Sequence, residues 1–259
     1  MSLFRSLSAA LAAALLGCAA AASAQASEQA ALPELGLMGT IPIYWGEAGS
    51  VEELVSGGSE PHWVRGHLER GYALRPLDTL AAADLADLDV LLLAQPRALS
   101  PAENVALDAW VRDGGRLLLF ADPMLTGPTR FAIGDRRRPQ DVILLSPILA
   151  HWGLELQFDV ERPEGPATVT VDSRAIPVNR PGSFVVRDAD AGCSVGAEGL
   201  LATCRLGEGQ ATLLADAALL DLHESSPASA AALDWLVGEA LAPIGESAGT
   251  GGDRAHLHP

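Results

Sequence analysis

The sequence predicts an α/β fold with a mostly parallel sheet, and three adjoining segments carry that prediction. Residues 90–94 (Val-Leu-Leu-Leu-Ala) and 117–121 (Leu-Leu-Leu-Phe-Ala) are short, continuous apolar runs, as in strands that are buried on both faces. Between them, residues 100–103 (Ser-Pro-Ala-Glu) have the capping-box pattern that begins a helix, and the glycines at 114 and 115 are suited to end it. A strand, a helix and a second parallel strand form a βαβ unit, whose crossover is almost always right-handed.

The first 26 residues have the pattern of an export signal. Arg5 supplies a short basic region, residues 7–16 are apolar but too few to span a membrane comfortably, and small residues at 22–26 fit a cleavage site. Residues 15–18 (Leu-Leu-Gly-Cys) also resemble a bacterial lipobox, in which the cysteine, here Cys18, is lipidated. Ordinary cleavage, a lipoprotein and an uncleaved anchor all remain open. We therefore expect a periplasmic or otherwise exported protein, attached to a membrane only through its signal or a lipid.

Strand and helix patterns alternate between this signal and the βαβ unit. After a linker, we expect a strand at 37–45, a helical turn at 51–55, a helix that opens at Glu60-Pro61 and ends at Gly71, a strand at 72–77 and a short helix at 80–88. Combined with the two buried strands, this order predicts a flavodoxin-like sheet with its switch point between the first and third strands.

Residues 126–141 are expected to form a loop past the carboxyl end of the 117–121 strand, where open α/β sheets place ligand-binding loops. This loop holds the concentrated positive charge of the chain, at Arg136, Arg137 and Arg138. Loops positioned by a rigid scaffold often carry function, but a solvated surface loop has the same pattern. A docking or anion-binding loop and a plain surface loop both remain open.

The pattern changes after a short helix, which we expect to be capped by Ser146 and to end at Gly153. Residues 154–205 contain short runs with period-two alternation separated by prolines, and they predict a β-rich insertion. Cys193 and Cys204 are the cysteines that follow the signal, and in an exported protein they most simply form one disulfide.

The main domain is expected to span residues 37–241. It closes with a buried strand at 210–216, which returns to the main sheet, and a helix capped by Ser226. The Gly-rich, polar tail 245–259 is expected to be disordered. Two histidines, at 256 and 258, fall in that tail, where no scaffold fixes them, so we predict no metal site.

The composition excludes several classes of function. The chain has 33 acidic and 17 basic residues and a net charge of −16, so its surface repels phosphate backbones and nucleic acid is not an expected partner. Every basic residue is arginine, which excludes Schiff-base chemistry and the lysine of a P-loop. The Gly-x-Gly-x-x-Gly pattern of dinucleotide sites is also absent, and we predict no cofactor.

Polar side chains follow the carboxyl ends of the predicted parallel strands, and we expect them to line one ligand cleft: Trp45, Glu47, Gln95, Asp122 and Asp216. Glu47 and Asp122 would serve as an acid and a base if they faced each other, but strand-end acids are also common helix caps and turn residues. The chain has no Gly-x-Ser-x-Gly elbow, and neither Ser nor Cys follows the 117–121 strand. We therefore predict a cleft without a catalytic residue.

Several of these segments also form a pattern when they are taken together. They are the 90–96 strand, the helix from Ser100, the run Asp-Gly-Gly-Arg-Leu-Leu-Leu-Phe-Ala-Asp-Pro at 113–123, residues 149–153, and the closing strand and helix near 207–216 and 232–236. This pattern resembles the soluble domain of GldG-like proteins, which are auxiliary components of ABC transport systems. That domain is similar to class I glutamine amidotransferases and to the intraflagellar-transport-like domain, and it usually lacks the amidotransferase nucleophile. The resemblance covers most of residues 37–241.

The resemblance implies a class I glutamine amidotransferase-like fold and a non-enzymatic, exported auxiliary or binding subunit. Its expected partners are the membrane subunits of an ABC transporter. The usual family members carry a C-terminal transmembrane segment, which we do not find in this sequence. Two other functions remain open. One is a periplasmic hydrolase or sugar-handling enzyme that uses Glu47 and Asp122. The other is a periplasmic small-ligand binding protein with the Arg136–Arg138 loop as its lid.

Overall fold

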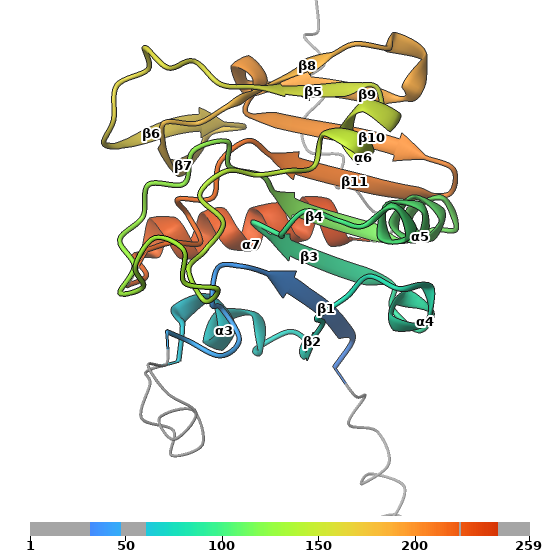
Figure 1. The fold of residues 1–259 in the computed structure, drawn as a ribbon, viewed down its shortest axis with the longest axis horizontal. Coiled ribbons are helices and arrows are strands. Elements are labelled where there is room, and N and C mark those ends of the chain that lie inside the picture. Colours follow the sequence, from blue (N-terminus) through green and yellow to red (C-terminus); the bar gives the residue numbers. More distant parts are fainter. Residues whose placement is uncertain (1–31, 48–60, 223, 243–259) are drawn as a thin grey trace, which may run out of the picture. The chain divides into compact units, whose positions relative to one another are not determined.

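The computed structural model describes residues 32–47, 61–222 and 224–242 (Figure 1). The fold below concerns the unit that begins at Glu34. Several predictions lie outside the described residues: the signal with Cys18, the helical turn at 51–55, the helix opening at Glu60, and the tail 245–259 with its two histidines.

A seven-stranded sheet forms the centre of this unit, in the order β2-β1-β3-β4-β11-β10-β9. Five strands are mutually parallel: β1 (Glu34–Gly39), β2 (Ala73–Pro76), β3 (Val90–Ala94), β4 (Arg116–Phe120) and β11 (Gly209–Leu214). At the far edge, β10 (Leu201–Leu206) pairs antiparallel with β11, and β9 (Cys193–Gly196) pairs antiparallel with β10. The predicted flavodoxin-like order, with the switch between β1 and β3, is confirmed, and β11 joins the main sheet beside β4 as expected.

Helices cover both faces of the sheet. Because right-handed crossovers that run in opposite directions place their helices on opposite faces, α3 (Trp63–Leu68) is separated from α4 (Ala82–Leu85) and α5 (Pro101–Arg112). The closing helix α7 (Pro227–Leu241) lies with α3, since His67 Nε2 is 2.6 Å from Asp234 Oδ1. On the other face, α6 (Ser146–His151) lies beside α5, and Trp152 Nε1 donates to Asp108 Oδ1 at 2.8 Å.

The β3-α5-β4 unit has the predicted form. All five residues of β3 are buried, as are four of the five in β4. Ser100 and Glu103 form the expected capping box, with the Glu103 N–H donating to Ser100 Oγ at 3.3 Å and the Ser100 N–H donating to Glu103 Oε2 at 2.8 Å. Gly114 takes φ +111° after the helix, a conformation that favours glycine.

The prediction for the first strand is wrong at both ends. Strand β1 spans Glu34–Gly39, whereas residues after Thr40 turn, with Gly46 N–H donating to the Pro42 carbonyl at 2.9 Å. Pro42 lacks the N–H that would continue the ladder. Ile41 and Ile43 are nevertheless buried, so this apolar turn has the composition of a strand.

Two helix starts also differ from prediction. Ser146 lies inside α6 and Leu145 occupies the N-cap position, with no side-chain hydrogen bond to the helix. Helix α3 begins only at Trp63, with His62 as its cap, and ends at Leu68. Proline at the second position fits either register of α6, which explains why the motif alone placed the cap one residue too late.

The predicted β-rich segment divides between three sheets. Strand β5 (Leu154–Gln157) pairs with β8 (Ser183–Val186), and β6 (Pro166–Val171) pairs with β7 (Arg174–Asn179). Short 3-10 turns at Ala189–Ala191 and Ala197–Gly199 flank β9, which belongs with β10 to the main sheet. Cys193 and Cys204 are direct partners across these two strands and form a disulfide.

Candidate functional site

A buried glutamine joins the segments that leave β1, β3 and β4. The Gln95 side chain is fully buried; its Nε2 donates to the carbonyls of Asp122 at 2.9 Å and Gln140 at 2.8 Å, and its Oε1 accepts the Asp122 N–H at 2.8 Å. Thr40 Oγ1 donates to the Gln95 carbonyl at 2.6 Å and accepts the Gln140 N–H at 2.8 Å. Gln95 also holds φ +50°, a strained backbone that these bonds fix in place.

Asp122 follows β4 and is 1% exposed. Its Oδ1 accepts the Met124 N–H at 2.8 Å and its Oδ2 accepts the Ala217 N–H at 3.1 Å. Burial raises the pKa of Asp122 to about 6, although the two N–H groups pull it the other way. The carboxylate therefore holds two loops together at a cost in desolvation.

Asp216 has the same arrangement at the end of β11. It is fully buried; Oδ1 accepts the Ala218 N–H at 2.7 Å and Oδ2 accepts the Asn179 N–H at 2.9 Å. Burial and the charge of Asp122 raise the pKa of Asp216 well above its usual range. Since both acids face backbone donors, neither presents a carboxylate oxygen to solvent.

The other two residues of the predicted cleft lie outside this network. Trp45 is 61% exposed and contacts the Tyr44 ring edge-on at 4.8 Å between centroids. Glu47 bonds to the following loop, where Arg130 Nη1 donates to its carbonyl at 2.9 Å. The structure thus unites Gln95, Asp122 and Asp216, and the bonds that unite them do not extend to Trp45 or Glu47.

Two of the three arginines in the arginine-rich loop form ion pairs with acidic residues of the same loop. Arg137 pairs with Asp135 at 2.7 Å and lies over the Phe131 ring, and Arg138 pairs with Asp141 at 2.9 Å. Arg136 is exposed, and no ion pair engages it within the described part of the chain. The charge that this loop offers to a partner is therefore smaller than three arginines suggest.

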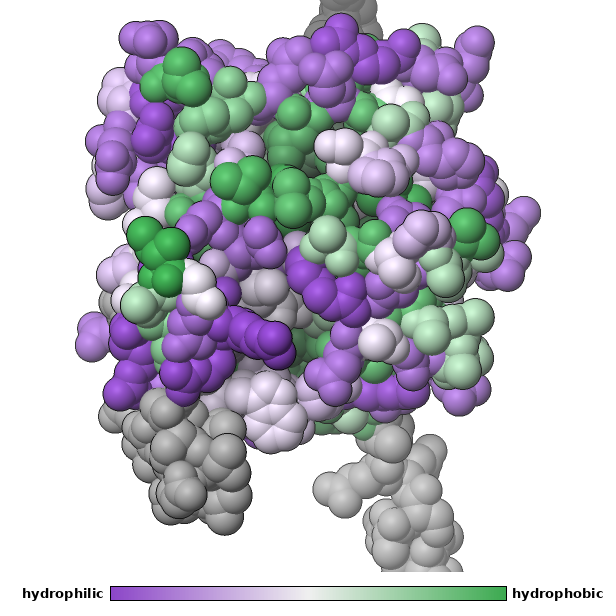
Figure 2. All heavy atoms as spheres, viewed as in Figure 1, coloured by the Kyte–Doolittle hydropathy of each residue, from purple (hydrophilic) through white to green (hydrophobic). Residues whose placement is uncertain are grey.

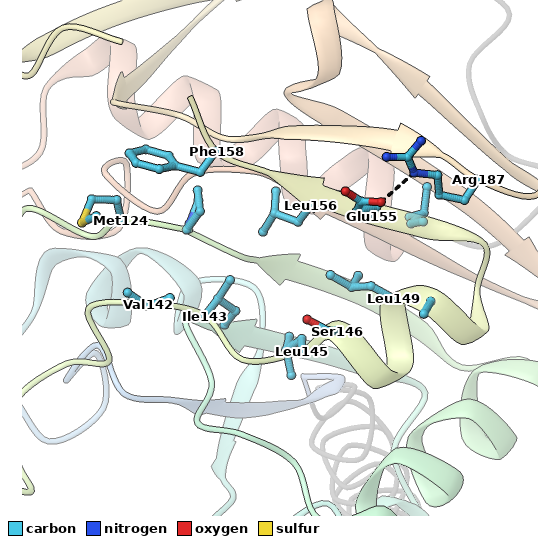
Figure 3. A pocket seen from close by; sticks show the side chains of 13 residues that line it. Met124, Val142, Ile143, Leu145, Ser146, Leu149, Glu155, Leu156, Phe158 and Arg187 are labelled. Atoms are coloured by element: carbon cyan, nitrogen blue, oxygen red, sulfur yellow. Dashed lines mark hydrogen bonds and ion pairs between the residues drawn. The ribbon is translucent and has the colours of Figure 1, made fainter. Parts of the chain in front are cut away.

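An apolar pocket that sequence reasoning missed lies next to the buried network (Figure 3). It has a volume of about 530 Å³ and is lined by residues 123–124, segment 142–150, β5 with Phe158, and Arg187. Around it, Figure 2 shows apolar side chains gathered near the middle of this face. Val142 and Leu144 are 43% and 52% exposed. That apolar run before α6 was the available signal, and the sequence analysis assigned it no role.

The buried network supports two walls of this pocket. Asp122 fixes Met124 through its Oδ1, and the Asp122 carbonyl accepts the Ile143 N–H at 3.2 Å. Gln95 holds Gln140, just before the second wall. Buried polar residues at the strand ends therefore position loops whose apolar side chains face an open space.

No group of three potential metal ligands occurs within residues 32–47, 61–222 and 224–242. Over the same residues, no helix has the length and apolar character needed to cross a membrane.

Comparison with known proteins gives one family match and several distant structural likenesses. A family model described as "ABC-type uncharacterized transport system" matches residues 38–175, from β1 into β7 and more than half of the 259 residues. No functionally curated protein matches the chain.

Three solved structures illustrate the likenesses. The mmIFT52 N-terminal domain has 13% identity and a TM-score of 0.48, with 79% of this chain and 97% of that one covered. A putative ThuA-like protein from Bacteroides uniformis has 9% identity and a TM-score of 0.46, with 83% and 95% covered. The exo-β-1,4-mannosidase Op5Man5 from an Opitutaceae bacterium has 15% identity and a TM-score of 0.43; 85% of this chain is covered but only 36% of that one. The chain thus spans about a third of the mannosidase.

The family match covers four of the segments that carry the resemblance to the GldG-like auxiliary domain: 90–96, the helix from Ser100, 113–123 and 149–153. The closing strand and helix near 207–216 and 232–236 lie beyond the matched residues, and the match confirms the resemblance. The chain belongs to the family of ABC-type uncharacterized transport systems.

Proposed function

We propose that this protein is a non-enzymatic, exported auxiliary subunit that binds beside an ABC-type transporter. The observation that carries the proposal is the family match over residues 38–175, which includes the end of β1, strands β2 to β4, and the pocket-lining residues 123–124 and 142–150. The export pattern of the first 26 residues supports a periplasmic location.

The geometry of the strand ends supports a non-catalytic role. A general acid or base must reach the proton that it transfers, but both oxygens of Asp122 and of Asp216 accept backbone N–H groups in a buried setting. The carboxylate of Glu47, the partner that a hydrolase would need, accepts the Arg130 backbone N–H at 3.4 Å. We therefore favour a binding role for this edge of the sheet over a sugar-handling or hydrolytic one.

Within this proposal, the strand-end residues and the arginine loop have different roles. Gln95, Asp122 and Asp216 brace the loops, and the exposed Arg136 is the group of the 136–138 triplet that is open to an acidic surface of a transporter subunit. Electrostatic contacts of this kind set orientation and association rate more than affinity.

Co-purification from native membranes tests the association. A C-terminally tagged chain, crosslinked in its source cell, should recover an ABC permease or ATPase subunit, and Arg136→Glu should reduce that recovery more than Arg174→Glu, a matched exposed arginine on β7. Recovery of no transporter subunit would count against the proposal. Cell fractionation of the chain with and without residues 1–26 would test export. Labelled fatty acid incorporated by the wild type but not by Cys18→Ser would show lipid anchoring.

A further inference from the structure

The pocket beside α6 has its charged side chains at one end, and Ser146 adds a hydroxyl near its middle (Figure 3). Leu156 and Phe158 form one side, and Ile143 and Leu149 face them from the other. Glu155 and Arg187 lie at the end away from Met124. A ligand with an apolar body and one polar head matches this division.

The arginine at the polar end keeps most of its donors. Arg187 Nε donates to Glu155 Oε2 at 2.6 Å, while Gln157 Nε2 donates to Glu155 Oε1 at 3.0 Å. No hydrogen bond from Nη1 or Nη2 of Arg187 occurs within the described residues. Glu155 therefore orients the guanidinium through Nε and leaves the terminal fork, the geometry that binds a carboxylate bidentately, available.

A second guanidinium lies near the apolar end. Arg180 stacks over Phe158 with 5.2 Å between its Cζ and the ring centroid. On a chain of net charge −16, one arginine that lines the pocket and a second that stacks on the lining Phe158 favour an anionic ligand over a cationic one. The side chains at the polar end are about half exposed, 54% for Arg187 and 48% for Glu155, so a charged head would stay hydrated there.

We propose that this pocket binds an amphipathic aliphatic carboxylate, with its chain between β5 and α6 and its head on Nη1 and Nη2 of Arg187. A sugar or nucleotide would leave its hydroxyls unpaired along the apolar walls, which is costly. A volume of about 530 Å³ falls in the usual range for small-molecule sites. The inference goes beyond the association with a transporter and does not depend on it.

Calorimetry on the purified full chain, with dodecanoate kept below its micelle concentration, tests the head-group contact. We expect saturable binding, and we expect Arg187→Ala to weaken it by about tenfold, the typical value of a charge-assisted hydrogen bond. Arg112→Ala is the matched control, because Arg112 is an arginine of similar exposure (43%) that pairs with Asp108 outside the pocket. Equal affinity of wild type and Arg187→Ala would overturn the proposal.

A second variant tests the place of the aliphatic chain. Ala150 lines the pocket from the exposed side of α6, so Ala150→Trp should fill the space while the chain still folds. We expect loss of dodecanoate binding with an unchanged unfolding midpoint. Undiminished binding to Ala150→Trp would show adsorption elsewhere and overturn the proposal.

Head-group charge separates the remaining alternatives. Dodecyltrimethylammonium should bind more weakly than dodecanoate, and Glu155→Gln should not weaken dodecanoate binding. A preference for the cation that Glu155→Gln abolishes would reverse the assignment. Since β5 has β8 as its one partner strand among the described residues, an extended apolar peptide is the competing occupant; its binding with no dodecanoate binding would also overturn the proposal. Failure of co-purification leaves these measurements unaffected.

Discussion

Two buried carboxylates, Glu103 and Asp122, contact the loop that follows β3, and their surroundings shift their pKa values in opposite directions. Glu103 is 7% exposed and accepts from Arg97 Nη1 and Nη2 at 3.0 and 2.7 Å, and this pairing lowers its pKa to about 2. Asp122 is 1% exposed, has no ion pair within the described residues, and has its pKa raised to about 6 by burial. The same loop supplies Arg97 to the first and Gln95 to the second.

The difference shows what each acid does for the fold. Glu103 also accepts the N–H groups of Leu80 and Ser100, so its charge fastens α5 to the loop after β2 and stabilises the folded state while it does so. Asp122 fastens the pocket loops through backbone N–H groups alone, and its charge is held at an energetic cost. Costly ionisable groups of this kind are more frequent near functional sites, which agrees with the pocket beside it.

Removing the Asp122 carboxylate should cause the largest loss of stability among the substitutions considered for these two acids. Asp122→Ala leaves the buried N–H of Ala217 and the N–H of Met124 without acceptors, which should lower the free energy of unfolding by about 2–4 kcal/mol. Urea unfolding followed by circular dichroism measures it. If the free energy of unfolding fell by less than about 0.5 kcal/mol, the usual effect of a surface substitution, the loops would not depend on Asp122.

The pH dependence of stability should carry the sign of the raised Asp122 pKa. Its folded pKa of about 6 exceeds the ordinary value of 3.8, so its contribution is fully present below pH about 4 and is lost as pH rises through about 6. The size is on the order of 3 kcal/mol for this shift. Asp216, whose pKa is also raised, acts in the same direction.

Asp122→Asn isolates this contribution. It removes the titration and keeps one acceptor oxygen, so the difference in unfolding free energy between wild type and Asp122→Asn should shrink from pH 4 to pH 7. A constant difference would show that Asp122 titrates in the folded state as it does in the unfolded one.

Glu103→Gln should give a pH profile of the opposite sign. Because the folded pKa of Glu103, about 2, is below its ordinary value of 4.5, its contribution is present above pH about 4.5 and is lost as pH falls through about 2. At neutral pH, Glu103→Gln should cost about 1–2 kcal/mol, since Gln keeps one acceptor for two backbone donors. Denaturant titrations of both proteins at pH 3 and pH 7 would check this, and a larger difference at pH 3 would contradict the assignment.

Local patterns predicted the Glu103 region better than the Asp122 region. The capping box at 100–103 joins residues close in sequence, and the apolar runs at 90–94 and 117–121 are local sequence patterns. The βαβ unit and the sheet order can therefore be predicted from the spacing of these patterns. The position of Asp122 at a strand end was also predictable. Its burial was not, because the groups that cover it, such as the Ala217 N–H, come from almost one hundred residues further along the chain.

The pocket was hidden for the same reason. Its walls come from β5, α6 and the segments after β4. Their apolar residues are of the same types as core residues, so the sequence does not distinguish the two. The long-range bonds of Gln95 and Asp122 position the segments that carry these residues, and no local pattern reveals such bonds.

An exposed ion pair should give the smallest change in stability, and it serves as a reference for the buried pair at Glu103. Arg65 and Glu69 form an exposed i,i+4 pair at 2.8 Å, with side chains 31% and 43% exposed. Solvent screens this pair, so Glu69→Gln should change the unfolding free energy by less than about 0.5 kcal/mol. If this exposed substitution matched Glu103→Gln in size, the stabilisation at Glu103 would come from the presence of an ion pair as such. The expected gap instead assigns it to burial, which makes the Arg97 pairing valuable and the unpaired charge of Asp122 costly.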